Sequence, residues 1–187
     1  MLPERKPPLK ATNPMNQFLY YIKPNDCENH NDLEKKNYTN NLSLAVYIRI
    51  NGNKIFLPGD LMKDGMEFII KHDRGLRNKL IEGVDILIAP HHGLKSSFST
   101  KLFESIKNGK TRCLNIVSEK QTTDDSTRIV DTRYSSTDYC EGKNNLTDGK
   151  EKVCQRKTSN GHIVIDYSSS TPSIKIVVGT KDLLNEF

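Results

Sequence analysis

Two short segments carry the residues whose types and positions could do chemistry. Leu57-Pro58-Gly59-Asp60 ends in a carboxylate, and Ala89-Pro90-His91-His92-Gly93 holds two adjacent imidazoles. Carboxylate oxygen and neutral imidazole nitrogen are ligands that zinc accepts, and manganese and iron accept them too. The sequence therefore predicts Asp60, His91 and His92 as metal ligands, provided that folding brings the two segments together.

Each of these residue types also has a structural interpretation. An Asp that follows Gly at the end of a strand is commonly a turn residue or a helix cap, and adjacent His residues occur in surface turns. The long separation between Asp60 and His91 in the sequence does not by itself bring their side chains together. The metal hypothesis therefore depends on the elements that position them.

Both segments follow apolar stretches that are predicted to be strands. Leu42–Ile50 and Lys54–Leu57 flank Asn51-Gly52-Asn53, which is typical of a tight hairpin turn. Val84–Ala89 predicts a short buried strand that ends just before the His pair. Ligands of α/β folds commonly bind at the carboxyl ends of strands, so Asp60 and the His pair both stand where a site is expected.

The rest of the chain predicts further strands and helices of a layered α/β domain. We expect a strand at Asn16–Lys23 and a polar surface loop from Asn25 to Asn41. Helices are expected from Gly65 to Ile81 and from Ser99 to Ile106, because their apolar residues approximate one face. The remaining predicted strands are Arg112–Ser118, Val153–Arg156, Gly161–Tyr167 and Ser173–Val178.

Composition divides the chain into a leader or linker over residues 1–15 and a domain over residues 16–187. The leader holds four of the eight prolines. Within the domain, residues 119–150 are almost wholly polar and are predicted to be an excursion on the surface. The four cysteines lie far apart without a C-x-x-C pair, which argues against a zinc knuckle or a disulfide framework, and Cys140 and Cys154 are expected to be free thiols.

Charge and hydropathy indicate a soluble protein. The 187 residues carry a net charge of +5 with no dominant charged block, which excludes a disordered polyelectrolyte. No apolar run approaches the roughly 20 residues that a membrane span needs, and the start of the chain does not read as a secretory signal. We therefore expect a cytoplasmic protein that does not enter a membrane.

The motifs taken together resemble the C-terminal half of the metallo-β-lactamase fold. They are most similar to the hydrolase domain of the competence protein of DNA uptake and its soluble relatives. The resembling segments are NNLSLAVYIRINGNKIFLPGDLM, VDILIAPHHGLKSSFS, LNIVS and RKTSNGHIVID. Leu94 departs from the Ser that usually follows His-His-Gly. The resemblance implies a four-layer αββα sandwich, of which this chain supplies the C-terminal half.

The resemblance also implies a metal-dependent hydrolase. Asp60 would bridge two zinc ions, with manganese or iron as alternatives, and one of His91 and His92 would be a terminal ligand. Two metal ions lower the pKa of a shared water and polarise the bond to be cleaved. The nuclease-like members of the family make a phosphodiester or nucleic acid the favoured substrate.

One family motif is missing from this sequence. The family carries an H-x-H-x-D-H loop in the first half of the fold, and the single upstream histidine, His30, has no companion that would form it. Asp60, His91 and His92 give three ligands at most, so we expect the isolated chain to have little or no hydrolase activity. The chain would be a fragment, one part of a split gene or a degenerate relative.

The alternative function is a non-catalytic remnant that acts as a binding or assembly module. Half of a two-sheet sandwich leaves apolar strand faces exposed, which predicts a polypeptide partner that supplies the missing N-terminal half. Two basic sets are weaker candidates for contact with an anionic substrate or nucleic acid, since surface lysines are commonly only solvated. These sets are Lys95, Lys101, Lys107 and Lys110, and Arg128, Arg133, Lys143, Lys150 and Lys152 with Tyr134 and Tyr139. His162 is expected to be structural.

Overall fold

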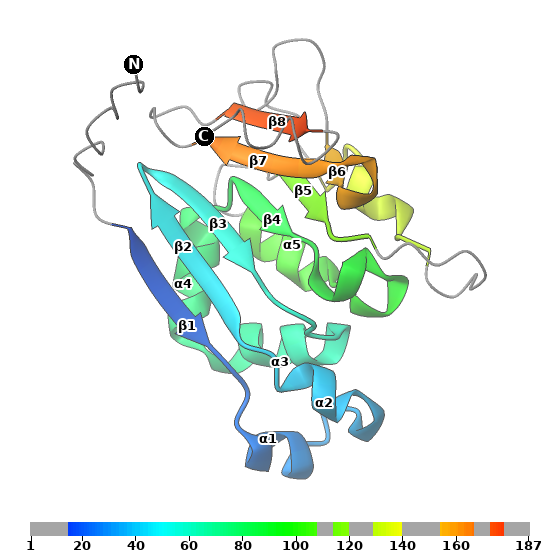
Figure 1. The fold of residues 1–187 in the computed structure, drawn as a ribbon. Coiled ribbons are helices and arrows are strands. Elements are labelled where there is room, and N and C mark those ends of the chain that lie inside the picture. Colours follow the sequence, from blue (N-terminus) through cyan, green and yellow to red (C-terminus); the bar gives the residue numbers. More distant parts are fainter. Residues whose placement is uncertain (1–14, 108–113, 120–128, 140–153, 167–172, 178–187) are drawn as a thin grey trace, which may run out of the picture.

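A mixed sheet of six strands forms the centre of the molecule in the computed structural model, which describes residues 15–107, 114–119, 129–139, 154–166 and 173–177 (Figure 1). The spatial order of the strands follows the sequence, and β1, β2 and β3 are antiparallel whereas β3 to β6 are parallel. The α/β class expected from the sequence is therefore confirmed. The strands are β1 Asn16–Tyr20, β2 Ala45–Ile50, β3 Asn53–Leu57, β4 Ile86–Ile88, β5 Leu114–Val117 and β6 Gln155–Lys157.

Three helices cover one face of this sheet: α3 Lys63–His72, α4 Arg74–Glu82 and α5 Thr100–Lys107 (Figure 1). The main hydrophobic core lies between these helices and the sheet. Its fully buried side chains include Tyr47 and Phe56 from the sheet and Leu76 and Leu102 from the helices.

The other face of the sheet carries a second, smaller core. A hairpin of β7 (His162–Asp166) and β8 (Ser173–Val177) forms a separate two-stranded sheet. Its Ile163 and Ile165 pack against Ile86, Leu114 and Ile116 of the large sheet. Toward β1 this face is open, since Leu19 is 58% exposed.

The hairpin between β2 and β3 forms as the Asn-Gly pair predicts. Asn51 and Gly52 have φ angles of 49° and 81°, and the strands pair from Ile50 opposite Asn53 to Val46 opposite Leu57. This register places Leu57 at the end of β3, so that Pro58-Gly59-Asp60 leaves the sheet at its carboxyl edge.

The single helix expected over Gly65–Ile81 is wrong: it is two helices that meet at Asp73. This residue has an extended backbone (φ −97°, ψ 103°), and its side chain accepts a hydrogen bond from the Leu76 amide at 2.9 Å. Asp73 therefore ends α3 and caps α4, because a capping side chain replaces the missing backbone acceptor of a first turn.

The polar surface loop expected from Asn25 to Asn41 is also wrong. The segment folds into α1 Pro24–Asn29, the 3₁₀ turn η1 Lys35–Asn37 and α2 Tyr38–Asn41, and the preceding strand already ends at Tyr20. The Asp64 carboxylate at the start of α3 holds this segment. It accepts hydrogen bonds from the Glu34 amide and from the side chains of Asn37 and Asn41, at 2.8 to 3.0 Å.

Other expectations have mixed outcomes. Cys154 is disulfide-bonded, in contrast to the expected free thiol, whereas Cys27 is a buried free thiol. Residues 1–14, Cys140 and most of 119–150 lie outside the described residues. None of the described helices is both long enough and apolar enough to cross a membrane.

Candidate functional site

Folding places the two chemistry-bearing segments side by side. Strands β3 and β4 are parallel neighbours, with Ile55 opposite Ile86, so both segments emerge at the same edge of the sheet. Beyond the strands, the His91 amide donates a hydrogen bond to the Gly59 carbonyl at 3.0 Å. Burial lowers the pKa of the His91 ring, and the charge of Asp60 is near enough to oppose that effect in part. Residues 59–60 and 91 therefore form one local unit.

Gly59 permits the turn that presents Asp60. Its φ angle is 63°, in the region that favours glycine. A Cβ at this position would lie 3.1 Å from the Ser43 Cβ and 3.2 Å from the Leu44 carbonyl oxygen. The next residue, Asp60, is exposed, and its amide donates to Ser43 Oγ at 3.1 Å.

The His pair lies on η2 (Pro90–Gly93), a turn with an unusual backbone. His91 and His92 have φ angles of 44° and 60°. The left-handed conformation costs roughly 1–2 kcal/mol for a residue with a Cβ. The surrounding fold enforces it through hydrogen bonds at 2.8 to 2.9 Å from the Ala89 amide to the Ile116 carbonyl and from Ser97 Oγ to the Pro90 carbonyl.

The two imidazoles have different environments, with ring centroids 5.9 Å apart. His92 Nδ1 lies 2.8 Å from the Ser118 carbonyl oxygen. A carbonyl only accepts, so Nδ1 carries the proton and the neutral ring offers its lone pair at Nε2. Histidine ligands of metals are commonly oriented by such a bond from the other ring nitrogen.

His91 is held in its neutral form. Burial lowers its pKa from the ordinary value of 6.5, and Asp60 opposes this effect only in part while His92 adds to it. Within the described residues its Nδ1 atom is buried without a hydrogen-bond partner. A neutral imidazole at neutral pH keeps a lone pair for a proton or a metal ion.

The donor atoms are therefore of the kind that zinc accepts, but they are too few. In the part of the chain that the structure describes, no three His, Cys, Asp or Glu side chains are grouped so that they could hold a metal ion. Catalytic zinc sites use three protein ligands. Asp60 with His91 or His92 is at most part of such a set.

Val130 and Asp131, which the sequence analysis did not single out, contact the turn that carries the His pair. Val130 forms a β-bridge with Leu94, and the Asp131 amide donates to the Gly93 carbonyl at 2.8 Å. A Cβ at Gly93 would lie 3.4 Å from a Val130 methyl group and 3.1 Å from a methyl group of Val117 in β5, so the turn is closely packed against both. The only sequence signal was the pair of apolar residues 129–130 within a polar stretch.

The described part of this segment differs from the surface excursion predicted for residues 119–150. Tyr134 is fully buried, and the Asn115 side chain donates to its carbonyl at 2.7 Å. Arg133 binds Asp131 through two nitrogens at 2.6 and 2.9 Å and lies over the Phe98 ring. These residues serve the fold, which weakens the case for nucleic-acid contact by Arg133 and Tyr134.

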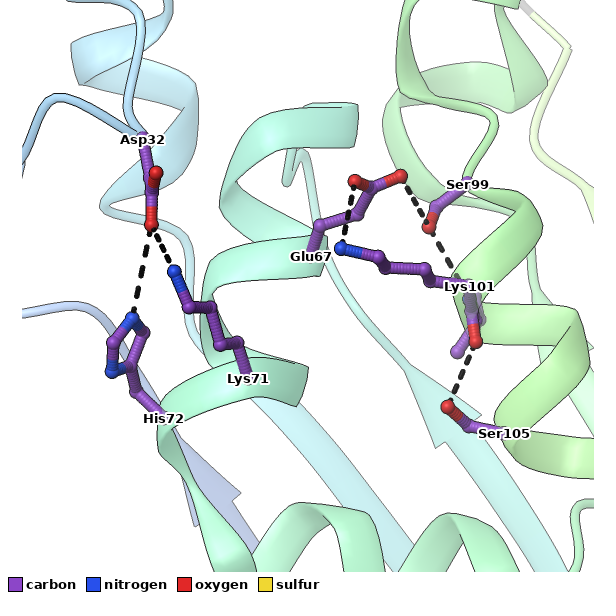
Figure 2. Close-up of polar contacts among 8 residues, drawn as sticks. Asp32, Glu67, Lys71, His72, Ser99, Lys101 and Ser105 are labelled. Carbon is purple, nitrogen blue, oxygen red and sulfur yellow. Dashed lines mark hydrogen bonds and ion pairs between the residues drawn. The ribbon is translucent and has the colours of Figure 1, made fainter.

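Figure 2 shows the neighbouring helices, where charged side chains pair with one another. Lys101 lies 3.6 Å from Glu67, whose carboxylate also accepts from Ser99. Across α3, Asp32 accepts from Lys71 at 2.7 Å, with His72 at 4.0 Å. Of the basic set near the His pair, Lys101 is thus partly neutralised, Lys95 is exposed, and Lys110 lies outside the described residues.

An apolar groove runs beside the site. Its volume is about 910 Å³, and it lies between β3, β4 and β5 of the large sheet and residues 158–165, which include most of β7. Leu57, three residues before Asp60, and Ser118, which binds His92, both line it. The predicted structural residue His162 is exposed at its rim. Most of the remaining wall is aliphatic, with Ile88, Ile116 and Ile163 among its residues, and Thr158 and Ser159 add hydroxyl groups.

Comparisons of this chain with family models, with curated proteins and with solved structures found no match. The family resemblance therefore rests on the motifs that carry it.

Proposed function

We propose that this chain is part of a metal-dependent hydrolase of the metallo-β-lactamase superfamily. Asp60 and one imidazole of the His pair would contribute to a zinc centre, with manganese or iron as alternatives. The remaining ligands would come from a polypeptide segment that carries the H-x-H-x-D-H loop. The observation that supports this proposal is the hydrogen bond from His91 to Gly59, because it joins the two motifs at one edge of the sheet.

His92 is the better candidate for the ligand. Its bond to the Ser118 carbonyl fixes the tautomer that presents Nε2, whereas the Nδ1 atom of His91 is buried. A metal ion bound there would supply an activated water for hydrolysis. Asp60 and His92 would hold the ion, and burial would keep the nearby His91 ring neutral. A phosphodiester is the favoured substrate.

Zinc titration of the purified chain tests the site. We expect weak zinc binding, measured by competition with a chromogenic chelator, and a further loss of at least about tenfold in Asp60→Asn and His92→Ala. Glu104→Gln is a matched control, since Glu104 is an exposed carboxylate on α5. Zinc affinity that is unchanged in both site variants would contradict the proposal.

Activity assays test whether the site is incomplete. With zinc or manganese, the isolated chain is expected to show little or no turnover of phosphodiester, DNA or β-lactam substrates. Robust turnover that Asp60→Ala abolishes would show that the chain carries a complete centre, and would contradict the expected need for another segment.

The open face of the sheet favours a second candidate function, an assembly module. Leu19, Val46 and Leu57 lie in one row across β1, β2 and β3, and Leu57 lines the apolar groove. A polypeptide that supplies the missing half would cover this row with a second sheet and complete the αββα sandwich. In that case the chain binds its partner whether or not Asp60 is intact.

A further inference from the structure

The loop that carries Asp60 is held by the residues that lead into β2. After β3 ends at Leu57, the amide of Asp60 donates to Ser43 Oγ and the amide of Met62 donates to Asn41 Oδ1, each at 3.1 Å. These two bonds flank Leu61, whose side chain is fully buried. The turn is therefore fixed on both sides of a buried anchor.

Asn41 is itself fixed in place. It is 1% exposed, and its Nδ2 donates to the Asp64 carboxylate at 3.0 Å while its Oδ1 accepts from Met62. Asp64 also accepts from Asn37 Nδ2 at 2.8 Å. One amide side chain thus connects the end of α2 with the loop and with the first turn of α3.

Ser43 fits against Gly59 with little free space. A Cβ at Gly59 would lie 3.1 Å from the Ser43 Cβ and 3.2 Å from the Leu44 carbonyl oxygen, so there is little room for a side chain at position 59. The Gly59 carbonyl in turn accepts from the His91 amide at 3.0 Å. A chain of direct contacts therefore runs from Ser43 through residues 59 and 60 to His91.

We propose that Ser43 and Asn41 are positioning residues that fix Asp60 beside the His pair. Ser43 Oγ sets the direction of the Asp60 amide, and Asn41 sets the exit of the loop at Met62. The inference rests on the proposed function for the role of Asp60 as a metal ligand. The restriction of the loop by Ser43 and Asn41 is a separate property, which can be measured without metal.

The experiment compares Ser43→Ala with Ser43→Thr, which keeps the hydroxyl. Ser105→Ala is the matched control, because Ser105 Oγ likewise makes one hydrogen bond to the backbone, which it donates to the Lys101 carbonyl within α5 (Figure 2). Amide hydrogen exchange by NMR reports the loop, and zinc competition reports the site. We expect Ser43→Ala to speed exchange at Asp60 about tenfold and to weaken zinc binding about tenfold.

In Ser43→Thr and Ser105→Ala both quantities are expected to stay near their original values. Ser43→Ala with unchanged exchange at Asp60 would overturn the inference. Amide exchange at Asp60 could rise in Ser43→Ala while zinc affinity is unchanged in both Ser43→Ala and Asp60→Asn. That result would contradict the proposed metal site but support the positioning role of Ser43. Should Ser43→Ala not fold, the unmodified chain decides: its Asp60 and Met62 amides must both be protected from exchange, and fast exchange at both would overturn the inference.

Discussion

His91 and His92 occupy left-handed backbone conformations that side chains other than glycine seldom adopt. Such strain persists only where the surrounding structure enforces it, and it gathers at functional sites. Here the enforcing contacts come from the Gly59 carbonyl, the Ser118 carbonyl and the Asp131 segment next to Gly93. The strain fixes both imidazoles on one turn, whose His91 amide donates to the carbonyl of Gly59, the residue before Asp60.

This strain predicts an unusual order of stability among variants at position 91. His91→Ala and His91→Gly both remove the ring, but only glycine adopts a φ of 44° without steric cost. We expect His91→Gly to be more stable than His91→Ala by about 1 kcal/mol in urea unfolding. At Glu104 within α5 the order should reverse, because alanine is favoured over glycine in a helix. Equal stability of the two variants at position 91 would show that its backbone is not strained.

The neutral state of His91 predicts a dependence of stability on pH. Because burial lowers its pKa in the folded chain, the unfolded chain binds the proton first as the pH falls below 6.5. Stability is therefore lost from about that pH downward, until the folded chain is protonated too. His91→Asn tolerates the same backbone and should lose less stability between neutral and mildly acid pH. Urea unfolding with a chelator present measures this, and parallel curves for the two proteins would refute it.

At the scale of elements, the start of α3 is shaped by its contact with α2. A Cβ at Gly65 would collide with the Oδ1 atom of Asn41, the same atom that accepts from Met62. The helix therefore carries a glycine for tertiary reasons. Its intrinsic preference would be for alanine.

Gly65→Ala should consequently destabilise the protein by about 1–3 kcal/mol, as overpacking does, although the same change usually stabilises a helix. Gly75→Ala in α4 is the comparison. There the added methyl would lie 3.1 Å from Asp73 Oδ1 and 3.6 Å from the Tyr20 ring, whereas at Gly65 it would lie 2.1 Å from Asn41 Oδ1, so a smaller cost is expected. Thermal unfolding of both variants measures the difference, and a Gly65→Ala protein as stable as the original would contradict the packing described.

Elements with a strong local signal could be predicted from the sequence. The β2–β3 hairpin follows from its Asn-Gly turn, and β4 and β5 from their apolar runs. The helix at Tyr38–Asn41 could not, because a distant carboxylate, Asp64, accepts bonds from its polar segment. The break at Asp73 was hidden by apolar residues that continue on one face across it.

The proximity of the two chemistry-bearing segments could be predicted from the sequence, the metal role of their residues stays a prediction, and the contacts that support them could not be predicted. Asp60 and the His pair stand out by type and by their place after strands. That β3 and β4 are neighbours follows from the alternation of strands and helices. No local sequence pattern predicts the contacts of Val130 and Asp131 with the turn that carries the His pair, because Val130 pairs with Leu94, which is distant in the sequence. Contacts of this kind are set by tertiary packing alone.

The whole molecule has two unequal faces. One face of the large sheet is covered by α3, α4 and α5, with the main core beneath them. On the other face the hairpin of β7 and β8 packs against Ile86, Leu114 and Ile116, and Leu19 on the edge strand β1 is 58% exposed. Leu19 continues a row with Val46 and Leu57, which are half-buried, so the row is an apolar strip that another polypeptide could cover.

The open face should therefore drive association of the purified chain. We expect light scattering after size exclusion to give a mass above the 21.3 kDa of one chain at high protein concentration. Leu19→Lys should reduce this association, because a charge on an edge strand opposes the burial of its face. Ile81→Lys is the matched control: Ile81 is 51% exposed but lies on α4, on the covered side of the sheet. A chain that stays a clean monomer at every concentration, or one that both lysines affect equally, would argue against a docking face over β1 to β3.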